Sequence, residues 1–311
     1  YDIKLPLTIY NTSCYRGIPG KYIAAGPLAS RWLQQQFATD ATLARSGAQV
    51  LGEPAAGYLS HPGYDALPKA PYRYQEMLGV IWRENPSCYL EDGEQAVLMA
   101  ALMETDNAGR PLIDAWIKRS GLSADAWLEK LFEATVIPFY HLLCRYGVAL
   151  IAHGQNVTLV MKDYVPQRIL LKDFQGDMRL VDEDFPQAQS LPEQVKAVTA
   201  RLSADYIIHD LQTGNFVTVL RFISRLTLQC GVSETRFYQI LAGVLRGYMA
   251  AHPDLAERFA KFDLFKPQII RVILNPVKLT FSEHDGGSRM LPNYVTDLDN
   301  PLFLAPRESA Q

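Results

Sequence analysis

The chain has 311 residues, of which 48% are hydrophobic and 20% are charged, and its 30 basic and 33 acidic side chains give a formal net charge of −3. This composition excludes a disordered or low-complexity chain, and the length suits two ordinary domains or one large one. The charge balance gives no general attraction to nucleic acid or to anionic membranes. An anionic ligand would therefore need a local cluster of positive side chains.

The start of the chain and its cysteines favour a reducing compartment. No apolar run is long enough to span a membrane and no signal peptide is present, so the cytoplasm is the expected location. The chain opens on Tyr1 inside a strand-like segment, which we interpret as a fragment of a longer protein. Cys14, Cys88, Cys144 and Cys230 lie far apart and form no metal-binding pattern, which predicts free buried thiols.

The first third of the chain is predicted to mix strands and helices. Residues 1–10 have a strand pattern, and residues 27–38 have a helical pattern with Pro27 in the first turn. The stretch 47–74 is rich in Gly, Pro and Ala and predicts short strands and loops. Residues 78–83 and 95–103 indicate two buried strands, and the turn-rich segment between them favours an antiparallel connection.

From about residue 111 the pattern becomes mainly helical. Ser123 is a predicted N-cap for a helix over 124–146, which Pro138 should kink or split. Four more helical patterns cover residues 192–205, 215–230, 233–251 and 253–262. Gly231 is a stop signal after the second of these, and Ser233 is a start signal for the third. The predicted fold class is α+β, with a small mixed part followed by a mainly helical domain built around one β-hairpin.

That hairpin carries the most informative pattern. Two short apolar runs, 157–161 and 168–172, flank a polar turn at 162–167, and polar clusters stand at both outer ends: Ala152-His-Gly-Gln-Asn156 and Lys172-Asp-Phe-Gln-Gly-Asp177. Because a two-stranded hairpin brings its ends together, His153, Gln155 and Asn156 should lie beside Asp173 and Gln175. Oxygen ligands of this type suit Mg²⁺, which takes one or two carboxylates plus substrate phosphates and water. The alternative is a polar hairpin end that binds nothing.

A second candidate cluster lies near the start of the chain. Residues 11–21 follow a strand that carries Lys4, and they supply hydroxyls, glycines and cations of the kind that a phosphate or carboxylate needs. The Gly17–Lys21 segment is too short for a P-loop, and Tyr22 stands where that motif has a Ser or Thr. On its own the segment is also compatible with an ordinary turn.

Other polar residues carry weaker signals. His209 and Asp210 lie within a helical pattern, and His141 on an apolar helix face is expected to be a core histidine. Zinc-protease, serine-hydrolase, Rossmann and zinc-site motifs are absent from the sequence. The aromatic residues are not interleaved with basic clusters, so a nucleic-acid partner is not expected.

Taken together, these motifs resemble the IucA/IucC family of NRPS-independent siderophore synthetases. The matching segments are Lys4-Leu-Pro-Leu7, Thr12-Ser13, Arg16, His153-Gly-Gln-Asn156, Lys172-Asp-Phe-Gln-Gly176, Leu211-Gln-Thr-Gly-Asn215 and Asn275-Pro-Val-Lys278. The resemblance runs over the whole chain, and the pair of hairpin motifs is its most specific part. It implies a cupped-hand fold, with a fingers portion at 1–110 and a palm at 111–311.

The resemblance also implies a reaction. ATP and a citrate carboxylate would form an acyl-adenylate and pyrophosphate, and an amine would then attack to form an amide. In the hydroxamate-forming branch of the family, the carboxylate belongs to citrate or a citryl mono-amide, and the amine is N6-acetyl-N6-hydroxylysine. ATP and Mg²⁺ are the implied cofactors, and a homodimer is implied for the full-length protein.

Carried over to matching positions, the resemblance assigns roles to single residues. Lys4 and Arg16 would contact the phosphates and the reacting carboxylate, which Thr12 would help to seat. His153 would stand at the α-phosphate, Asn156 near phosphate and metal, and Asp173 on Mg²⁺. The remaining implied contacts are Ser13, Gln155, Lys172 and Gln175 to phosphate and Lys278 to citrate.

Two departures from the family pattern stand out. The Ser-x-Arg-Thr phosphate motif that precedes the first strand in the family is missing here, so the fragment alone is expected to bind nucleotide weakly. Ile151 stands where citrate-first members often have an acidic residue.

Two other functions remain open from the sequence. One is a phosphotransferase related to aminoglycoside and choline kinases, which place Asp directly after a His-Gly pair where this chain has Gln155. The other is a non-catalytic domain that binds iron or a siderophore.

Overall fold

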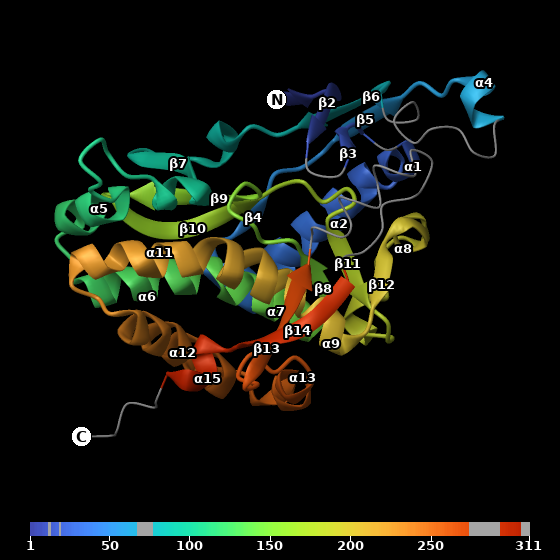
Figure 1. Cartoon of the computed structure of the whole chain (residues 1–311). Coiled ribbons are helices and arrows are strands. Elements are labelled where there is room, and N and C mark those ends of the chain that lie inside the picture. The colour runs from blue at the N-terminus through green and yellow to red at the C-terminus, as the bar shows by residue number, and fades with distance from the viewer. Residues whose placement is uncertain (12–13, 19, 67–76, 274–292, 306–311) are drawn as a thin grey trace.

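The computed structural model describes residues 1–11, 14–18, 20–66, 77–273 and 293–305. Figure 1 shows layers: the N-terminal strands lie over a four-stranded sheet, and a layer of helices that includes α6 and α11 lies on the other side of that sheet. Within the described ranges, no helix combines the length and the apolar character that crossing a membrane requires.

The N-terminal strands form two small antiparallel sheets. In the first, β6 (Gly79–Arg83) pairs with both β1 (Asp2–Lys4) and β5 (Ala55–Tyr58). The second is a hairpin of β2 (Leu7–Asn11) and β3 (Cys14–Arg16). The single strand predicted over 1–10 is thus two strands, because Pro6 has no N–H to donate to a ladder. The strand β3 lies within the 11–21 segment, so part of this candidate cluster is extended and not a turn.

The four-stranded sheet contains the predicted hairpin. Its order is β4-β10-β9-β7, with β4 at Gln49–Val50, β10 at Val165–Leu171, β9 at Val157–Lys162 and β7 at Glu94–Leu98. The turn is tighter than predicted, because Lys162 pairs with Val165 and leaves two residues in the loop. Asp163 and Tyr164 have φ values of 51° and 64°, the left-handed conformation that suits a two-residue hairpin loop.

The predicted pairing of 78–83 with 95–103 is wrong. β6 pairs with β1 and β5, whereas β7 pairs with β9. The apolar run also leaves the extended conformation after Leu98 and forms a 3₁₀ helix over Met99–Met103. Met99 and Leu102 are three residues apart, so this helix turns both onto one buried face.

The helix predicted over 124–146 forms in two pieces, as Pro138 indicated. They are α6 (Ala124–Thr135) and α7 (Ile137–Tyr146), and Pro138 lies in the first turn of α7, where its missing N–H does no harm. Ser123 caps α6 by accepting a hydrogen bond from the Ala126 amide at 3.2 Å. Trp127 of α6 donates to the Tyr164 carbonyl at 2.8 Å, which fixes this helix on the hairpin turn.

The start and stop signals of the later helices are also confirmed. Gly231 has φ +79° at the end of one helical stretch, and Ser233 caps α12 (Glu234–Ala251) by accepting from the Arg236 amide at 3.1 Å. The remaining helices are α1 (Gly20–Ile23), α2 (Gly26–Thr39), α3 (Ala41–Ser46), α4 (Pro62–Asp65), α5 (Leu112–Ser120), α8 (Glu193–Val198), α9 (Ala204–Ile207), α10 (His209–Leu211), α11 (Arg221–Leu226), α13 (Ala256–Lys261) and α15 (Pro301–Leu304). A π-helix at Gln212–Leu220 connects α10 to α11.

A further sheet was not predicted. Its order is β12-β11-β8, with β12 at Ala200–Leu202, β11 at Met178–Val181 and β8 at Val148–Leu150. The helix predicted over 192–205 is therefore wrong beyond Val198, because residues 200–202 pair in parallel with β11. A separate pair joins β13 (Gln268–Ile273) and β14 (Asn293–Asp299).

The core joins the helices to the sheets. Trp127, Phe132, Tyr140 and Phe237 are fully buried, and the Phe132 and Phe237 rings from α6 and α12 meet edge to face at 5.0 Å. Cys88, Cys144 and Cys230 are free, as predicted. Cys144 is buried, but Cys88 is exposed, so the prediction of burial is wrong for that thiol.

Candidate functional site

Two loops connect the β9–β10 hairpin to the β12-β11-β8 sheet. Residues 151–156 run from β8 into β9, and residues 172–177 run from β10 into β11; we call them the two rim loops. Leu171 pairs with Val157 on one side of them, and Met178 pairs with Leu150 on the other. The two rim loops therefore start and end on paired strands, which hold them next to each other.

Direct hydrogen bonds also connect the rim loops. The Lys172 amide donates to the Asn156 carbonyl at 3.3 Å, and the Ile151 amide donates to the Asp177 carbonyl at 3.2 Å. The Asn156 side-chain amide donates to Asp177 Oδ2 at 3.2 Å. The predicted meeting of the two hairpin ends is confirmed through Asn156. The approach of His153 and Gln155 to Asp173 and Gln175 remains a prediction.

Asp173 occupies the centre of this rim, and its carboxylate binds two cations. Lys4 Nζ lies 2.6 Å and Arg83 Nη2 lies 2.7 Å from Asp173 Oδ1. Burial acts to raise the pKa of Asp173, but the positive charges of Lys4 and Arg83 outweigh it and hold this pKa below its usual value. Asp173 is thus kept ionised, as a cation ligand must be.

Beneath Asp173 lies a buried ion pair that sequence reasoning missed. Glu53 is 1% exposed, and its Oε1 lies 3.4 Å from Arg83 Nε. Burial raises the pKa of Glu53, against the positive charge of Arg83. The available signal was a charged residue inside an apolar segment, since Arg83 ends a buried strand and Glu53 follows Val50-Leu51-Gly52.

Gln175 connects this ion pair to the second rim loop. Its Nε2 donates to Glu53 Oε2 at 3.0 Å. A Cβ at Gly26 would lie 2.0 Å from Gln175 Nε2, so glycine at the start of α2 is what allows the approach. Lys172 is partly buried beside these groups; burial lowers its pKa, which Asp173 opposes and Arg83 reinforces.

His153 and its neighbours in the first rim loop differ in exposure. His153 is partly exposed, and its Nδ1 accepts a hydrogen bond from the Gln155 amide at 3.3 Å, which assigns the neutral ring's proton to Nε2. The Gln155 side chain is exposed. Asn156 is 6% exposed, and because its nitrogen is bonded to Asp177, its Oδ1 is the atom that could hold a cation.

Some predicted site residues cannot be compared with the geometry. Thr12, Ser13 and Lys278 lie outside the described residues. Arg16 is described through its backbone, which pairs with Leu7 in the β2–β3 hairpin. The proposed phosphate and citrate contacts of these four residues remain predictions.

The donor set suits a divalent cation that arrives with its own ligands. No group of three or more His, Cys, Asp or Glu side chains that could hold a metal is found in the part of the chain that the structure describes. Asp173 with Asn156 Oδ1 would supply few protein oxygens, which is the arrangement that Mg²⁺ takes when phosphates and water complete its shell.

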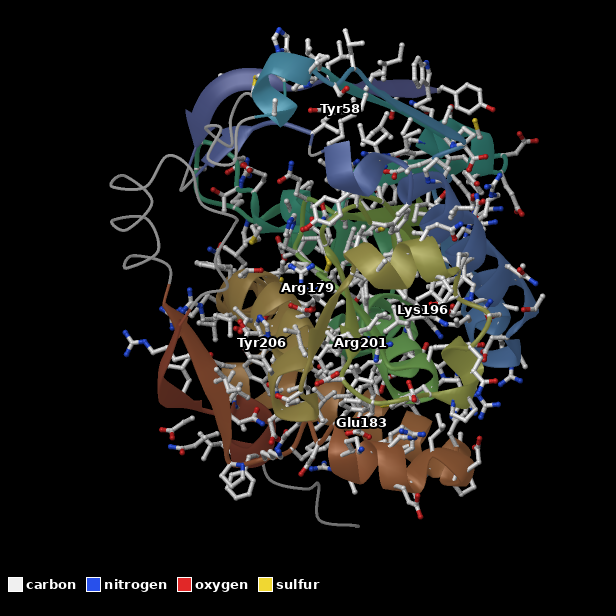
Figure 2. All side chains as sticks on the ribbon, turned by 90° about the vertical axis from the view of Figure 1, so that its right-hand side faces the viewer. Tyr58, Arg179, Glu183, Lys196, Arg201 and Tyr206 are labelled. Atoms are coloured by element: carbon white, nitrogen blue, oxygen red, sulfur yellow. The ribbon has the colours of Figure 1, made fainter. Side chains whose placement is uncertain are left out.

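Side chains behind the rim loops support them through hydrogen bonds to the backbone. Arg179 donates to the carbonyl oxygens of Met178, at 2.9 Å, and Gly176; Figure 2 shows Arg179 between the N-terminal strands and Tyr206. Asn215 of the π-helix donates to the Ala152 carbonyl at 3.0 Å, directly before His153. The Leu211–Asn215 motif is thus a brace for the first rim loop.

Asp210, beside this brace, is 3% exposed. Burial raises its pKa to about 7, with Asp177 acting in the same direction and Arg179 opposing it. His141 is a core histidine, as predicted: it is buried and hydrogen-bonded to Tyr248 at 2.7 Å and to Asp40 at 3.1 Å.

The chain is similar to several known proteins. Residues 1–104 match the model of the IucA/IucC family. Aerobactin synthase from Escherichia coli is 71% identical over 99% of this chain and 53% of its own length. The chain belongs to the IucA/IucC family. Aerobactin synthase from Vibrio mimicus is 59% identical over 98% of this chain and 52% of its own length, so the chain spans about half of these relatives.

Structural comparison confirms the α+β synthetase fold. The solved structure of aerobactin synthetase IucC from a hypervirulent Klebsiella pneumoniae pathotype superimposes with a TM-score of 0.84 at 64% identity. It covers 98% of this chain and 50% of that one. Residues 125–288 also match a family model described as ferric iron reductase FhuF-like transporter, which covers the mainly helical part. The phosphotransferase alternative finds no support in these comparisons.

Proposed function

We propose that this chain is the ATP-binding and acyl-transferring half of an aerobactin synthase. The full-length protein would adenylate a carboxylate of citrate or a citryl mono-amide and pass it to the amine of N6-acetyl-N6-hydroxylysine. The observation that carries the proposal is Asp173, held ionised by Lys4 and Arg83 where the two rim loops meet. The names of the similar proteins, aerobactin synthases, support the same reaction.

The first step brings two anions together. A carboxylate oxygen attacks the α-phosphorus of ATP, a P–O bond forms, and the bond to pyrophosphate breaks. Lys4, Arg16 and the Nε2–H of His153 would offset the repulsion and stabilise the charge on the five-coordinate phosphorus. Preorganised donors of this kind contribute about 3–4 kcal/mol each to transition-state stabilisation.

The second step needs no protein nucleophile. The amine nitrogen attacks the acyl carbon, the C–N bond forms, and the C–O bond to AMP breaks. Asp173 and Asn156 would hold Mg²⁺, which neutralises phosphate charge when bound. Ser13, Gln155, Lys172 and Gln175 are proposed to hold the phosphates, with Thr12 and Lys278 on the carboxylate substrate.

The proposal also includes the location, the oligomeric state and the domain division of the full-length protein. The full-length protein would act as a cytoplasmic homodimer, without nucleic acid or membrane partners, and its fingers and palm would divide near residue 110. The net charge of −3 supports the absence of a polyanionic partner.

Exchange of labelled pyrophosphate into ATP tests the proposal. With the full-length protein, exchange should require citrate or its mono-amide, and Arg16→Ala and His153→Ala should each reduce it by about 10²–10³ without loss of fold. Release of ADP would favour a kinase, and binding of a siderophore without exchange would favour a binding domain. Exchange at the wild-type rate in both variants would overturn the site assignment.

A further inference from the structure

The two cations on Asp173 occupy the same carboxylate oxygen. Lys4 Nζ and Arg83 Nη2 both donate to Oδ1, at 2.6 and 2.7 Å, while Arg83 Nη1 lies 3.5 Å from Oδ2. The Asp173 side chain is 15% exposed. A divalent cation that binds Oδ1 therefore competes with Lys4 and Arg83 for this oxygen.

Strand register explains why two cations meet here. Lys4 pairs with Ile81 across the antiparallel β1–β6 ladder, and Arg83 is two residues beyond Ile81. Residues directly opposite in such a ladder point to the same face, and so do residues two apart in one strand. Lys4 and Arg83 are thus diagonal neighbours on one face of this small sheet.

The two cations differ in how firmly they are held. Arg83 is 9% exposed in its side chain, and it is backed by Glu53, which is itself bonded to Gln175. Lys4 is 44% exposed and comes from an edge strand. Asp173 is its one ion-pair partner among the residues that the structure describes. Arg83 is therefore buried between two carboxylates, whereas Lys4 is exposed and has one ion-pair partner among the described residues.

Charge balance then decides what can replace Lys4. Arg83 and Lys172 both act on Asp173 through their positive charges, so a bare divalent cation would meet two further cations there. A polyphosphate chain brings the negative charge that offsets this repulsion, and it offers a displaced lysine a new partner.

We propose that Lys4 is an exchangeable counter-ion for Asp173, which holds the carboxylate in the nucleotide-free protein and moves to phosphate when a metal–nucleotide complex arrives. Arg83, fixed by Glu53, keeps its contact in both states. Before nucleotide binds, Lys4 thereby prevents the site from taking up a divalent cation. The inference rests on the proposed role of Asp173 as a metal ligand.

Manganese binding to the nucleotide-free, full-length protein tests this directly. Lys4→Met keeps the side-chain stem and removes the charge, so the affinity for Mn²⁺, measured by electron paramagnetic resonance, should rise about tenfold. Affinity for the metal–ATP complex should fall by a similar factor, because the lysine's phosphate contact is lost. Lys4→Arg should restore the low Mn²⁺ affinity, and Lys130→Met, on the exposed face of α6, should leave both affinities unchanged.

An unchanged or lower Mn²⁺ affinity in Lys4→Met would overturn the counter-ion role, with circular dichroism confirming that the variant is folded. Asp173→Asn in the Lys4→Met background should abolish the gained affinity, and its persistence would place the metal elsewhere. If pyrophosphate exchange is present in the wild type while Lys4→Met binds Mn²⁺ like the wild type, this inference fails and the proposed function stands. If exchange is absent, the proposed function fails.

Discussion

Two carboxyl groups of this protein, Asp173 in the rim and Asp210 beside the π-helix, are both largely buried, but their pKa values shift in opposite directions. Asp173 accepts direct hydrogen bonds from Lys4 and Arg83, and its pKa is lowered despite burial. Asp210 also has an arginine nearby, yet its pKa rises to about 7 because of burial.

The difference lies in where the arginine donors point. Arg83 donates to Asp173 itself, whereas Arg179 donates to the backbone carbonyls of Gly176 and Met178. A positive charge at a distance does not replace a direct hydrogen bond in offsetting the cost of burial. The protein therefore maintains a charged carboxylate in the rim, whereas the carboxyl behind it takes up a proton far more readily than an ordinary aspartate.

The largest expected effect comes from removing the rim charge. Asp173→Asn should lower pyrophosphate exchange by at least about 10²–10³, because the cation ligand and the counter-charge for Lys4 and Arg83 are both lost. Asp163→Asn, the same change at the exposed opposite end of the hairpin, should leave exchange unaltered. Equal exchange rates in the two variants would show that the Asp173 carboxylate has no role in the reaction.

Breaking the ion pair beneath the rim should cost stability. Glu53→Gln leaves Arg83 without its buried partner, so the free energy of unfolding should fall by about 3 kcal/mol in urea titrations. The matched change Glu133→Gln removes a surface pair with Lys130, both more than half exposed, and should cost less than about 1 kcal/mol. A loss at Glu53 no larger than that at Glu133 would show that the pair does not hold Arg83 in place.

Because of Asp210, the free energy of unfolding should fall as the pH rises. Its folded pKa of about 7 lies above the ordinary 3.8, so the folded state binds the proton more tightly, and stability is lost as pH rises between these values. The neutral Asp210→Asn lacks this loss and should gain roughly 3 kcal/mol on the wild type between pH 4 and pH 8. Chemical unfolding at both pH values measures this gain, with the same substitution at the exposed Asp92 as the control. If the unfolding free energies of Asp210→Asn and the wild type differ by the same amount at both pH values, Asp210 is ionised in the folded protein.

Local signals in the sequence predicted much of this molecule. Ser123, Pro138, Gly231 and Ser233 set helix boundaries through bonds and backbone conformations of their own neighbourhoods, and the structure confirms all four. The hairpin and the meeting of its ends followed from a pattern within about 25 consecutive residues, since antiparallel neighbours in sequence pair with little loop cost.

The missed features depend on contacts between distant segments. Arg83 lies beside Lys4 because β6 pairs with β1, which lies almost eighty residues earlier, and no local periodicity reveals that pairing. Strand β12 was read as helix because three residues carry too little pattern to show a parallel partner in β11. Of the cations around Asp173, the sequence therefore indicated Lys4 and Lys172, and the structure alone revealed Arg83.

The position of the hairpin in the four-stranded sheet determines how the protein could be divided. Strands β4 and β7 flank β10 and β9 on both sides, and both come from residues 1–104. Production of residues 112–311 alone would leave the outer edges of β9 and β10 bare and prone to aggregate. Cleavage of the intact protein near residue 108 should instead leave two pieces that stay together and come apart only in denaturant.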